Sequence, residues 1–137
     1  RGDESGTHKK SLEFWRTIPV DLVNSSGKWY REAGSGMGAT LNLTSSINGY
    51  TLTDRSTWTA FQNKGSLVVL FEGDPSMRNQ YGITMVNPAR HKHVKAPLAS
   101  AFIGWVISND GQAAINDFRI SGKQTFFANA AGYKRIN

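Results

Sequence analysis

The chain has 137 residues, of which 39% are apolar, so it has the length of one domain and enough apolar residues for a core. No apolar run approaches the roughly 18 residues of a membrane-spanning helix, and the absence of cysteine excludes disulfides and thiolate metal sites. The formal net charge of +6 favours encounter with anions, from small oxyanions to nucleic acid.

The first predicted helix covers residues 7–17 and ends before Pro19. Its apolar side carries Leu12, Phe14 and Trp15, whereas the charged residues and His8 are expected to face water. Residues 24–27 predict a turn, because Asn, Ser and Gly cluster there.

A glycine-rich segment, residues 34–38, leads into a second predicted helix over residues 39–47, which Asn48-Gly49 ends. The segment lacks the GK[ST] ending of a Walker loop and the strand lead-in and acidic partner of a dinucleotide fingerprint. Two interpretations remain: backbone N–H groups presented to an anion, or close packing of a helix start.

The next three predicted elements are a short strand at residues 50–54, a helix at 56–62 capped by Asp54 or Ser56, and a strand at 67–71. The last is a continuous apolar run without alternation, which is typical of a strand buried on both faces. Helices alternating with such strands favour an α/β fold.

The C-terminal part predicts a second buried strand at residues 81–86, an apolar helix at 97–107 and a further helix at 112–118. Inward-facing side chains are expected from both helices: Leu98, Phe102, Trp105 and Val106 from the first, and Ala114, Ile115 and Phe118 from the second. Residues 126–127 are expected in extended or irregular structure.

No catalytic or metal-ligating set emerges from the sequence. The three histidines, two of them in the basic segment 90–95, have no paired cysteine or HExxH spacing beside them, and no GxSxG motif is present. The basic segment lacks interleaved aromatics, so we predict a solvated surface loop rather than a nucleic-acid contact. An enzyme is therefore the weakest interpretation.

The segment Arg1-Gly2-Asp3-Glu4-Ser5-Gly6-Thr7 precedes the first helix and combines a guanidinium, two hydroxyls and the unpaired N–H groups of a helix start. A helix N-terminus carries partial positive charge and free donors, so it can receive an anion. The same residues also form an ordinary capping sequence. Both interpretations stay open on the residues alone.

Four stretches together resemble the tungstate-binding substrate-binding proteins of bacterial ABC importers. Residues 1–10 resemble that family's RGDxSGTHxKE segment, residues 29–42 its WYRExGxGMGATLN segment, and residues 50–57 its YTLTDRGT segment. Motifs between Gly73 and Gln112 resemble the C-terminal part of the family. Two departures, Ser11 for a usual glutamate and Ser56 for a usual glycine, lie beside the expected site and bear on ligand choice.

The resemblance implies an α/β, type II periplasmic-binding-protein-like fold, in which two lobes close on a ligand. Residues 1–72 would form the second lobe, and residues 73–137 would supply the hinge return strand and the C-terminal helices that pack on the first lobe. The chain begins at Arg1 without a methionine, which we interpret as a processed chain or a fragment. The first lobe would then come from another segment or chain.

The resemblance also implies the anion ligands. Arg1 would supply a positive side chain, and Ser5, Gly6 and Thr7 would supply hydroxyl and N–H donors, with Gly38 and Thr53 as further candidates by position. Asp3 and Asp54 would orient Arg1 or backbone donors without touching the anion. Tungstate carries no proton at neutral pH, so an ideal site offers only donors.

The implied function is binding of tungstate or molybdate as the extracytoplasmic receptor of an ABC importer, with a membrane permease as partner and no cofactor, metal or nucleic acid. The implied location is periplasmic or extracytoplasmic, with a lipid anchor in Gram-positive relatives. Two alternatives remain: the effector-binding domain of a transcription regulator, or a receptor for phosphate or sulfate. Phosphate often keeps a proton near pH 7, so Asp3 directed into the pocket would favour it.

Overall fold

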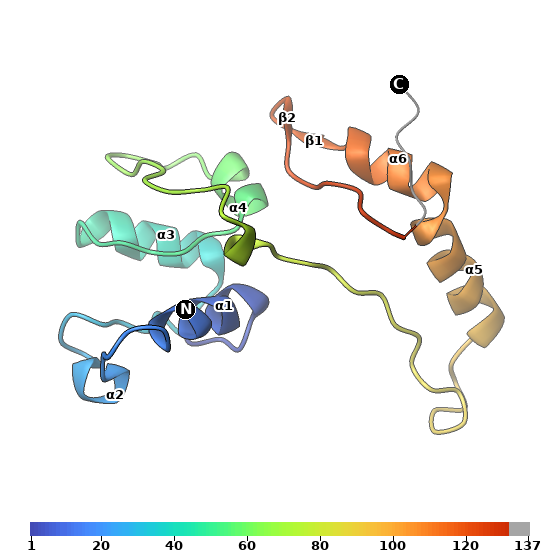
Figure 1. Ribbon diagram of the computed structural model, residues 1–137, viewed down its shortest axis with the longest axis horizontal. Helices are drawn as coiled ribbons and strands as arrows, with labels where there is room; N and C mark the ends of the chain where they lie inside the picture. The colour runs from blue at the N-terminus through green and yellow to red at the C-terminus, as the bar shows by residue number, and fades with distance from the viewer. Residues whose placement is uncertain (132–137) are drawn as a thin grey trace. The chain divides into compact units, whose positions relative to one another are not determined.

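The computed structural model describes residues 1–131 and divides into two compact units, Arg1–Asn79 and Gln80–Asn137 (Figure 1). Each unit is built mainly from helices joined by extended segments. In the described residues no helix has both the length and the apolar character needed to cross a membrane.

The first unit contains four α-helices and one 3₁₀ turn: α1 Gly6–Trp15, α2 Leu22–Ser25, α3 Met37–Ser46, α4 Arg55–Ala60 and η1 Pro75–Met77. The predicted helices at residues 7–17, 39–47 and 56–62 are confirmed as α1, α3 and α4. The short helix α2 replaces the start of the predicted turn, because Asp21 caps it by accepting a hydrogen bond from the Asn24 N–H at 3.0 Å.

The core of the first unit lies along α3. Met37 and Leu41 are buried there with Thr40 and Thr44, one helical turn apart. The two threonine hydroxyls donate to backbone carbonyls one turn back, at 3.1 Å to Gly36 and 2.8 Å to Thr40. These bonds satisfy hydroxyl groups that burial would otherwise leave without a partner.

An aromatic cluster joins α1 to the segment that precedes α3. The ring of Trp15 lies 5.5 Å from that of Trp29 and 6.1 Å from that of Tyr30, centroid to centroid. A few residues later, the Gly34 N–H donates to the Arg1 carbonyl at 2.7 Å. The start of the chain is therefore held against residues 29–34.

The second unit contains α5 Ala96–Ile107, α6 Asn109–Asp117 and a two-stranded hairpin, β1 Arg119–Ile120 and β2 Lys123–Gln124. Ser108 separates the helices and caps α6, because its hydroxyl accepts from the Gly111 N–H at 3.2 Å. Both predicted helices are confirmed, although α6 begins three residues earlier than predicted. Residues 126–127 are irregular, as expected.

The predicted strands at residues 50–54, 67–71 and 81–86 are wrong as regular strands, because none of them pairs within the described chain. The expected burial is also wrong: Leu70 is 71% exposed and Phe71 is 66% exposed. A strand forms only where a neighbouring strand accepts its hydrogen bonds. The described residues offer these apolar segments no such neighbour.

The predicted inward faces of the C-terminal helices are largely uncovered in the described chain, where Val106 and Ile115 are the partly buried members of the two sets. Leu98, Phe102 and Trp105 on α5 are exposed, and Phe118 at the end of α6 is half exposed. Instead, α6 buries the polar residues Gln112 and Asn116, together with Gly111. The reason is that α6 packs through hydrogen bonds: the Gln112 side chain donates to the Val106 carbonyl at 2.8 Å and accepts from the Ala130 N–H at 2.9 Å.

Gly111 allows the close approach of α6 to the end of α5, because a Cβ atom there would lie 2.0 Å from the Trp105 carbonyl oxygen. We predict that Gly111→Ala lowers the free energy of unfolding of the 137-residue chain by about 1–3 kcal/mol through overpacking. Urea unfolding followed by circular dichroism measures the change.

The matched control is Gly104→Ala on α5, where an added Cβ meets nothing within 4 Å. It should raise stability by roughly 0.5–1 kcal/mol, because alanine favours helix more than glycine does. Equal unfolding midpoints for the two variants would contradict the close approach.

Candidate anion-binding site

The loop that precedes α1 is a tight turn with two residues in the left-handed region. Gly2 has φ +69° and Glu4 has φ +57°. Ser5 then begins α1 as its N-cap, with its hydroxyl accepting from the His8 N–H at 3.2 Å. The turn thus brings Arg1 and Asp3 back beside the first turn of the helix.

The Asp3 carboxylate is the centre of this loop. One oxygen accepts from the Ser5 hydroxyl at 2.8 Å and from the Ser5 N–H at 3.3 Å. The other accepts from Arg1 Nε at 2.9 Å and forms a second hydrogen bond with Arg1 Nη2. Asp3 therefore binds Arg1 and a backbone N–H, the two kinds of group that it was expected to orient; its role toward a ligand stays a prediction.

These contacts also set the charge of Asp3. Partial burial of the carboxyl group acts to raise its pKa, but the hydrogen bonds from Ser5 and Arg1 outweigh it and lower the pKa from 3.8 to about 2. Asp3 is consequently ionised at neutral pH. Its two oxygens each accept two donors within the loop.

The donors left for a ligand are those that the loop does not use. Ser5 directs both its hydroxyl and its N–H at Asp3. Three groups have no hydrogen-bond partner within residues 1–131: Arg1 Nη1 and the backbone N–H groups of Gly6 and Thr7 in the first turn of α1. The α1 start thus offers the N–H donors and the partial positive charge that suit an anion.

His8 was expected to face water, and this expectation is wrong: only 8% of the residue is exposed. Its Nδ1 accepts a hydrogen bond from the Gly2 N–H at 3.2 Å. The helical pattern placed His8 on the polar side of α1, but the preceding loop folds back and covers it. The one signal in the sequence that could have marked His8 as a residue of this loop is its position in the RGDxSGTHxKE segment.

The remaining predicted residues lie elsewhere in the first unit. Gly38 is in the first turn of α3, whose N-cap Gly36 makes no side-chain capping bond. The Thr53 hydroxyl donates to the Asp54 carbonyl at 3.3 Å. In the part of the chain that the structure describes, no hydrogen bond connects Gly38 or Thr53 to the loop of residues 1–5.

Asp54 acts as the N-cap of α4. Its carboxylate accepts from the Thr57 N–H and the Thr57 hydroxyl, both at 2.8 Å, and from the Ser56 hydroxyl at 2.5 Å. It therefore binds a backbone donor at the start of α4, and its role toward a ligand stays a prediction. Within residues 1–131, Asp54 forms neither a hydrogen bond nor an ion pair with Arg1.

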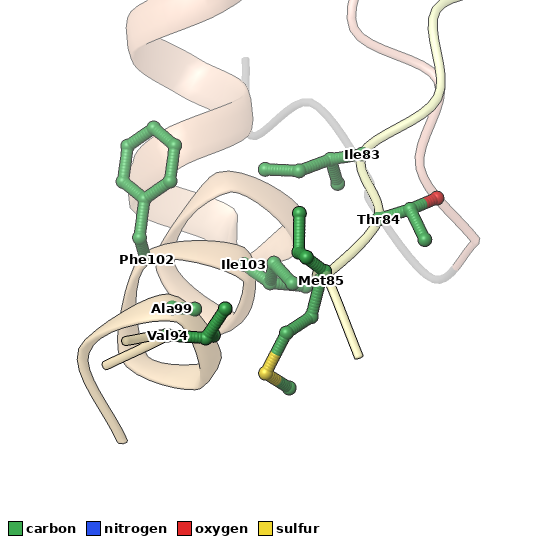
Figure 2. A pocket seen from close by; sticks show the side chains of 8 residues that line it. Ile83, Thr84, Met85, Val94, Ala99, Phe102 and Ile103 are labelled. Atoms are coloured by element: carbon green, nitrogen blue, oxygen red, sulfur yellow. The ribbon is translucent and has the colours of Figure 1, made fainter. Parts of the chain in front are cut away.

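Two other features of the chain, a basic loop and a hollow, both lie in the second unit. The basic loop at residues 90–95 is largely exposed, as predicted, and no group of three potential metal ligands occurs in the described residues. The second unit has a hollow of about 330 Å³ between residues 83–86 and α5 (Figure 2). Its lining is apolar except for one threonine: Ile83, Thr84, Met85, Val86, Val94, Ala99, Phe102 and Ile103.

We predict that the Asp3 carboxyl group titrates with a midpoint of about 2, measured by carboxyl ¹³C NMR. Because its folded pKa lies below the ordinary value, the loop is stabilised above about pH 4 and loses this contribution as the pH falls through about 2. Ser5→Ala removes a hydroxyl donor and should raise the Asp3 pKa.

The internal control is Asp21, whose pKa is lowered by hydrogen bonds from Asn24 rather than from Ser5. Ser5→Ala should leave its titration unchanged. A wild-type Asp3 midpoint near 4 would contradict the arrangement described above.

Comparisons with known proteins identify relatives of this chain. The chain is 42% identical over 135 residues to a "Putative ABC transporter anion-binding protein" of Haloferax volcanii, covering 95% of this chain and 39% of the relative. It is 35% identical over 128 residues to the tungstate-binding protein TupA of Peptoclostridium acidaminophilum, covering 93% of this chain and 43% of that protein. The chain is also 35% identical over 134 residues to the tungstate-binding protein TupA of Campylobacter jejuni, covering 95% of this chain and 49% of that protein.

The chain therefore spans less than half the length of these curated relatives. A solved structure, the tungstate-binding protein TupA from Desulfovibrio alaskensis G20, matches with a TM-score of 0.75 and 38% identity. The match covers 95% of this chain and 53% of that protein. This likeness confirms the predicted fold class, the type II periplasmic-binding-protein fold.

A family model described as a PBP superfamily domain matches residues 1–110. The match includes the Arg1–Thr7 loop, α1, α3 and α5. On this evidence the chain belongs to the PBP superfamily, with tungstate-binding proteins among its relatives.

Proposed function

We propose that this chain forms one wall of the oxyanion site in the extracytoplasmic receptor of an ABC importer, and that the anion is tungstate or molybdate. The observation that carries the proposal is the donor set at the start of α1. Arg1 Nη1 and the N–H groups of Gly6 and Thr7 are free of protein partners within residues 1–131, while Asp3 is fully engaged.

The engagement of Asp3 supports an unprotonated ligand. Phosphate often carries a proton near pH 7 and needs a carboxylate acceptor in the site. Asp3 accepts four hydrogen bonds from Arg1 and Ser5, so it has little capacity to accept another from a ligand. Tungstate and molybdate need no acceptor. Of these two anions, tungstate is favoured because two relatives are named tungstate-binding proteins.

The relatives also support binding rather than catalysis, and transport rather than gene regulation. Three are named as anion-binding or tungstate-binding proteins, and one name includes an ABC transporter. On this proposal the receptor lies outside the cytoplasm and its partner is a permease in the membrane. The permease recognises the state in which two lobes have closed on the anion.

The facing wall of the site would come from a first lobe that completes the protein. The relatives are about twice as long as this chain, which leaves room for such a lobe. The apolar side chains of α5, the hollow beside it and the unpaired segment 81–86 form the surface that it would cover. Burial of these groups would stabilise the assembly, since apolar area removed from water lowers the free energy.

We predict that the full-length two-lobe protein binds tungstate and molybdate with a Kd of about a micromolar or lower, near −8 kcal/mol. Isothermal titration with tungstate, molybdate, sulfate and phosphate at equal ionic strength measures this. Sulfate and phosphate should bind at least tenfold more weakly. Tighter binding of phosphate would overturn the choice of ligand, and binding of none of the four would overturn the receptor proposal.

Within the same protein, we predict that Arg1→Ala weakens tungstate binding by about 10–100-fold, because one charge-assisted hydrogen bond to the anion is lost. Arg16→Ala is the matched control. Arg16 is exposed at the C-cap of α1, at the opposite end of the helix from the loop, so its removal should leave the Kd unchanged. Equal Kd values for Arg1→Ala and wild type would remove Arg1 from the site.

A further inference from the structure

His8 is a buried polar residue that is not among the groups proposed to donate hydrogen bonds to the anion. Its Nδ1 accepts the Gly2 N–H at 3.2 Å. An imidazole nitrogen that accepts a hydrogen bond carries no proton, so the ring is neutral with its proton on Nε2. The bond therefore specifies one tautomer of one ring.

The Gly2 N–H that donates to His8 belongs to the peptide group between Arg1 and Gly2. The oxygen of the same peptide group, the Arg1 carbonyl, accepts from the Gly34 N–H at 2.7 Å. His8 and Gly34 thus bind the two ends of one peptide dipole. Because a peptide group is planar, fixing its N–H and its C=O fixes the orientation of the backbone that follows Arg1.

This peptide leads into a conformation that needs such support. Gly2 has φ +69°, and a Cβ atom built on it would lie 3.1 Å from Glu32 Cβ. The Arg1 guanidinium is held separately by Asp3. The backbone of Arg1 is therefore held by His8 and Gly34, and its guanidinium is held by Asp3. Of these three partners, His8 is the one that holds the backbone through a side chain.

We propose that His8 is a positioning residue of the anion site, whose neutral imidazole orients the Arg1–Gly2 peptide and thereby directs Arg1 at the ligand. This inference rests on the proposed function. It requires His8 to act through Arg1, without touching the anion. An apolar side chain at this position would leave the Gly2 N–H without its partner, and a protonated ring would have no acceptor for it.

Three variants of the full-length protein test this role by tungstate titration. His8→Phe keeps a planar ring but removes the acceptor, and should raise the Kd about tenfold. His8→Asn can place an amide oxygen where Nδ1 lies, and should restore the Kd to within about threefold of wild type. His8→Gln extends the amide beyond that point and should not restore it. Circular dichroism and thermal unfolding of the free proteins check that all three fold.

The double variant Arg1→Ala/His8→Phe separates positioning from general structure. If His8 acts through Arg1, adding His8→Phe to Arg1→Ala changes the Kd by less than about twofold, because the two effects are not additive. If His8 only maintains the fold, the second substitution costs the same tenfold again. Imidazole ¹⁵N NMR of the free wild-type protein should also find Nδ1 unprotonated and Nε2 protonated.

The outcomes distinguish this inference from the proposed function. A wild-type protein that binds no oxyanion overturns both. Equal binding after Arg1→Ala removes Arg1 from the site, and with it the role of His8, but leaves the receptor proposal standing. Weaker binding after Arg1→Ala with an unchanged Kd for His8→Phe, additive effects in the double variant, or a protonated Nδ1 overturns the role of His8 alone.

Discussion

The Arg1–Asp3 ion pair is the interaction on which the candidate site depends. It places a positive guanidinium and a negative carboxylate in contact, with side chains 14% and 21% exposed, so the pair contributes almost no net charge. An anion at the start of α1 would then be stabilised by oriented donors and the helix dipole rather than by a free cation. Such a site depends on geometry, which explains why so many contacts in this loop serve to hold Arg1 and so few groups face outward. It also suits selection by shape among anions of equal charge.

Local signals account for the helices that the sequence predicted correctly and for the contacts of Asp3 in the candidate site. Helix α1 follows a serine cap, α4 an aspartate cap, and α6 a serine cap, and each capping bond joins residues only three positions apart. The pairing of Asp3 with Ser5 and Arg1 is equally local, spanning two residues in each direction. Interactions this short in sequence are encoded by the residues themselves, and the resemblance to a known family is what predicts that they belong to an anion site.

Contacts between distant residues account for what the sequence could not predict. The apolar run 67–71 and the segment 81–86 indicate burial, but whether a segment becomes a strand depends on a neighbour that pairs with it. His8 shows the opposite error, since a polar residue on the polar side of a helix is expected in water. The contact that buries it depends on a loop whose turn is defined by left-handed backbone at Gly2 and Glu4. Neither periodicity nor composition carries information about such a turn.

The second unit differs from the first in what its interior is made of, and this difference bears on the assembly. Its buried residues on α6 are Gln112 and Asn116, joined to backbone and to Gln124 by hydrogen bonds, whereas its apolar side chains on α5 are exposed. Hydrogen bonds exchange one polar partner for another and add little net stability, while burial of apolar area is the main favourable term in folding. On the proposed function, a first lobe that covers α5 would stabilise this unit, because it would remove that apolar area from water. Folding of the second unit and its contact with such a lobe would then be thermodynamically coupled.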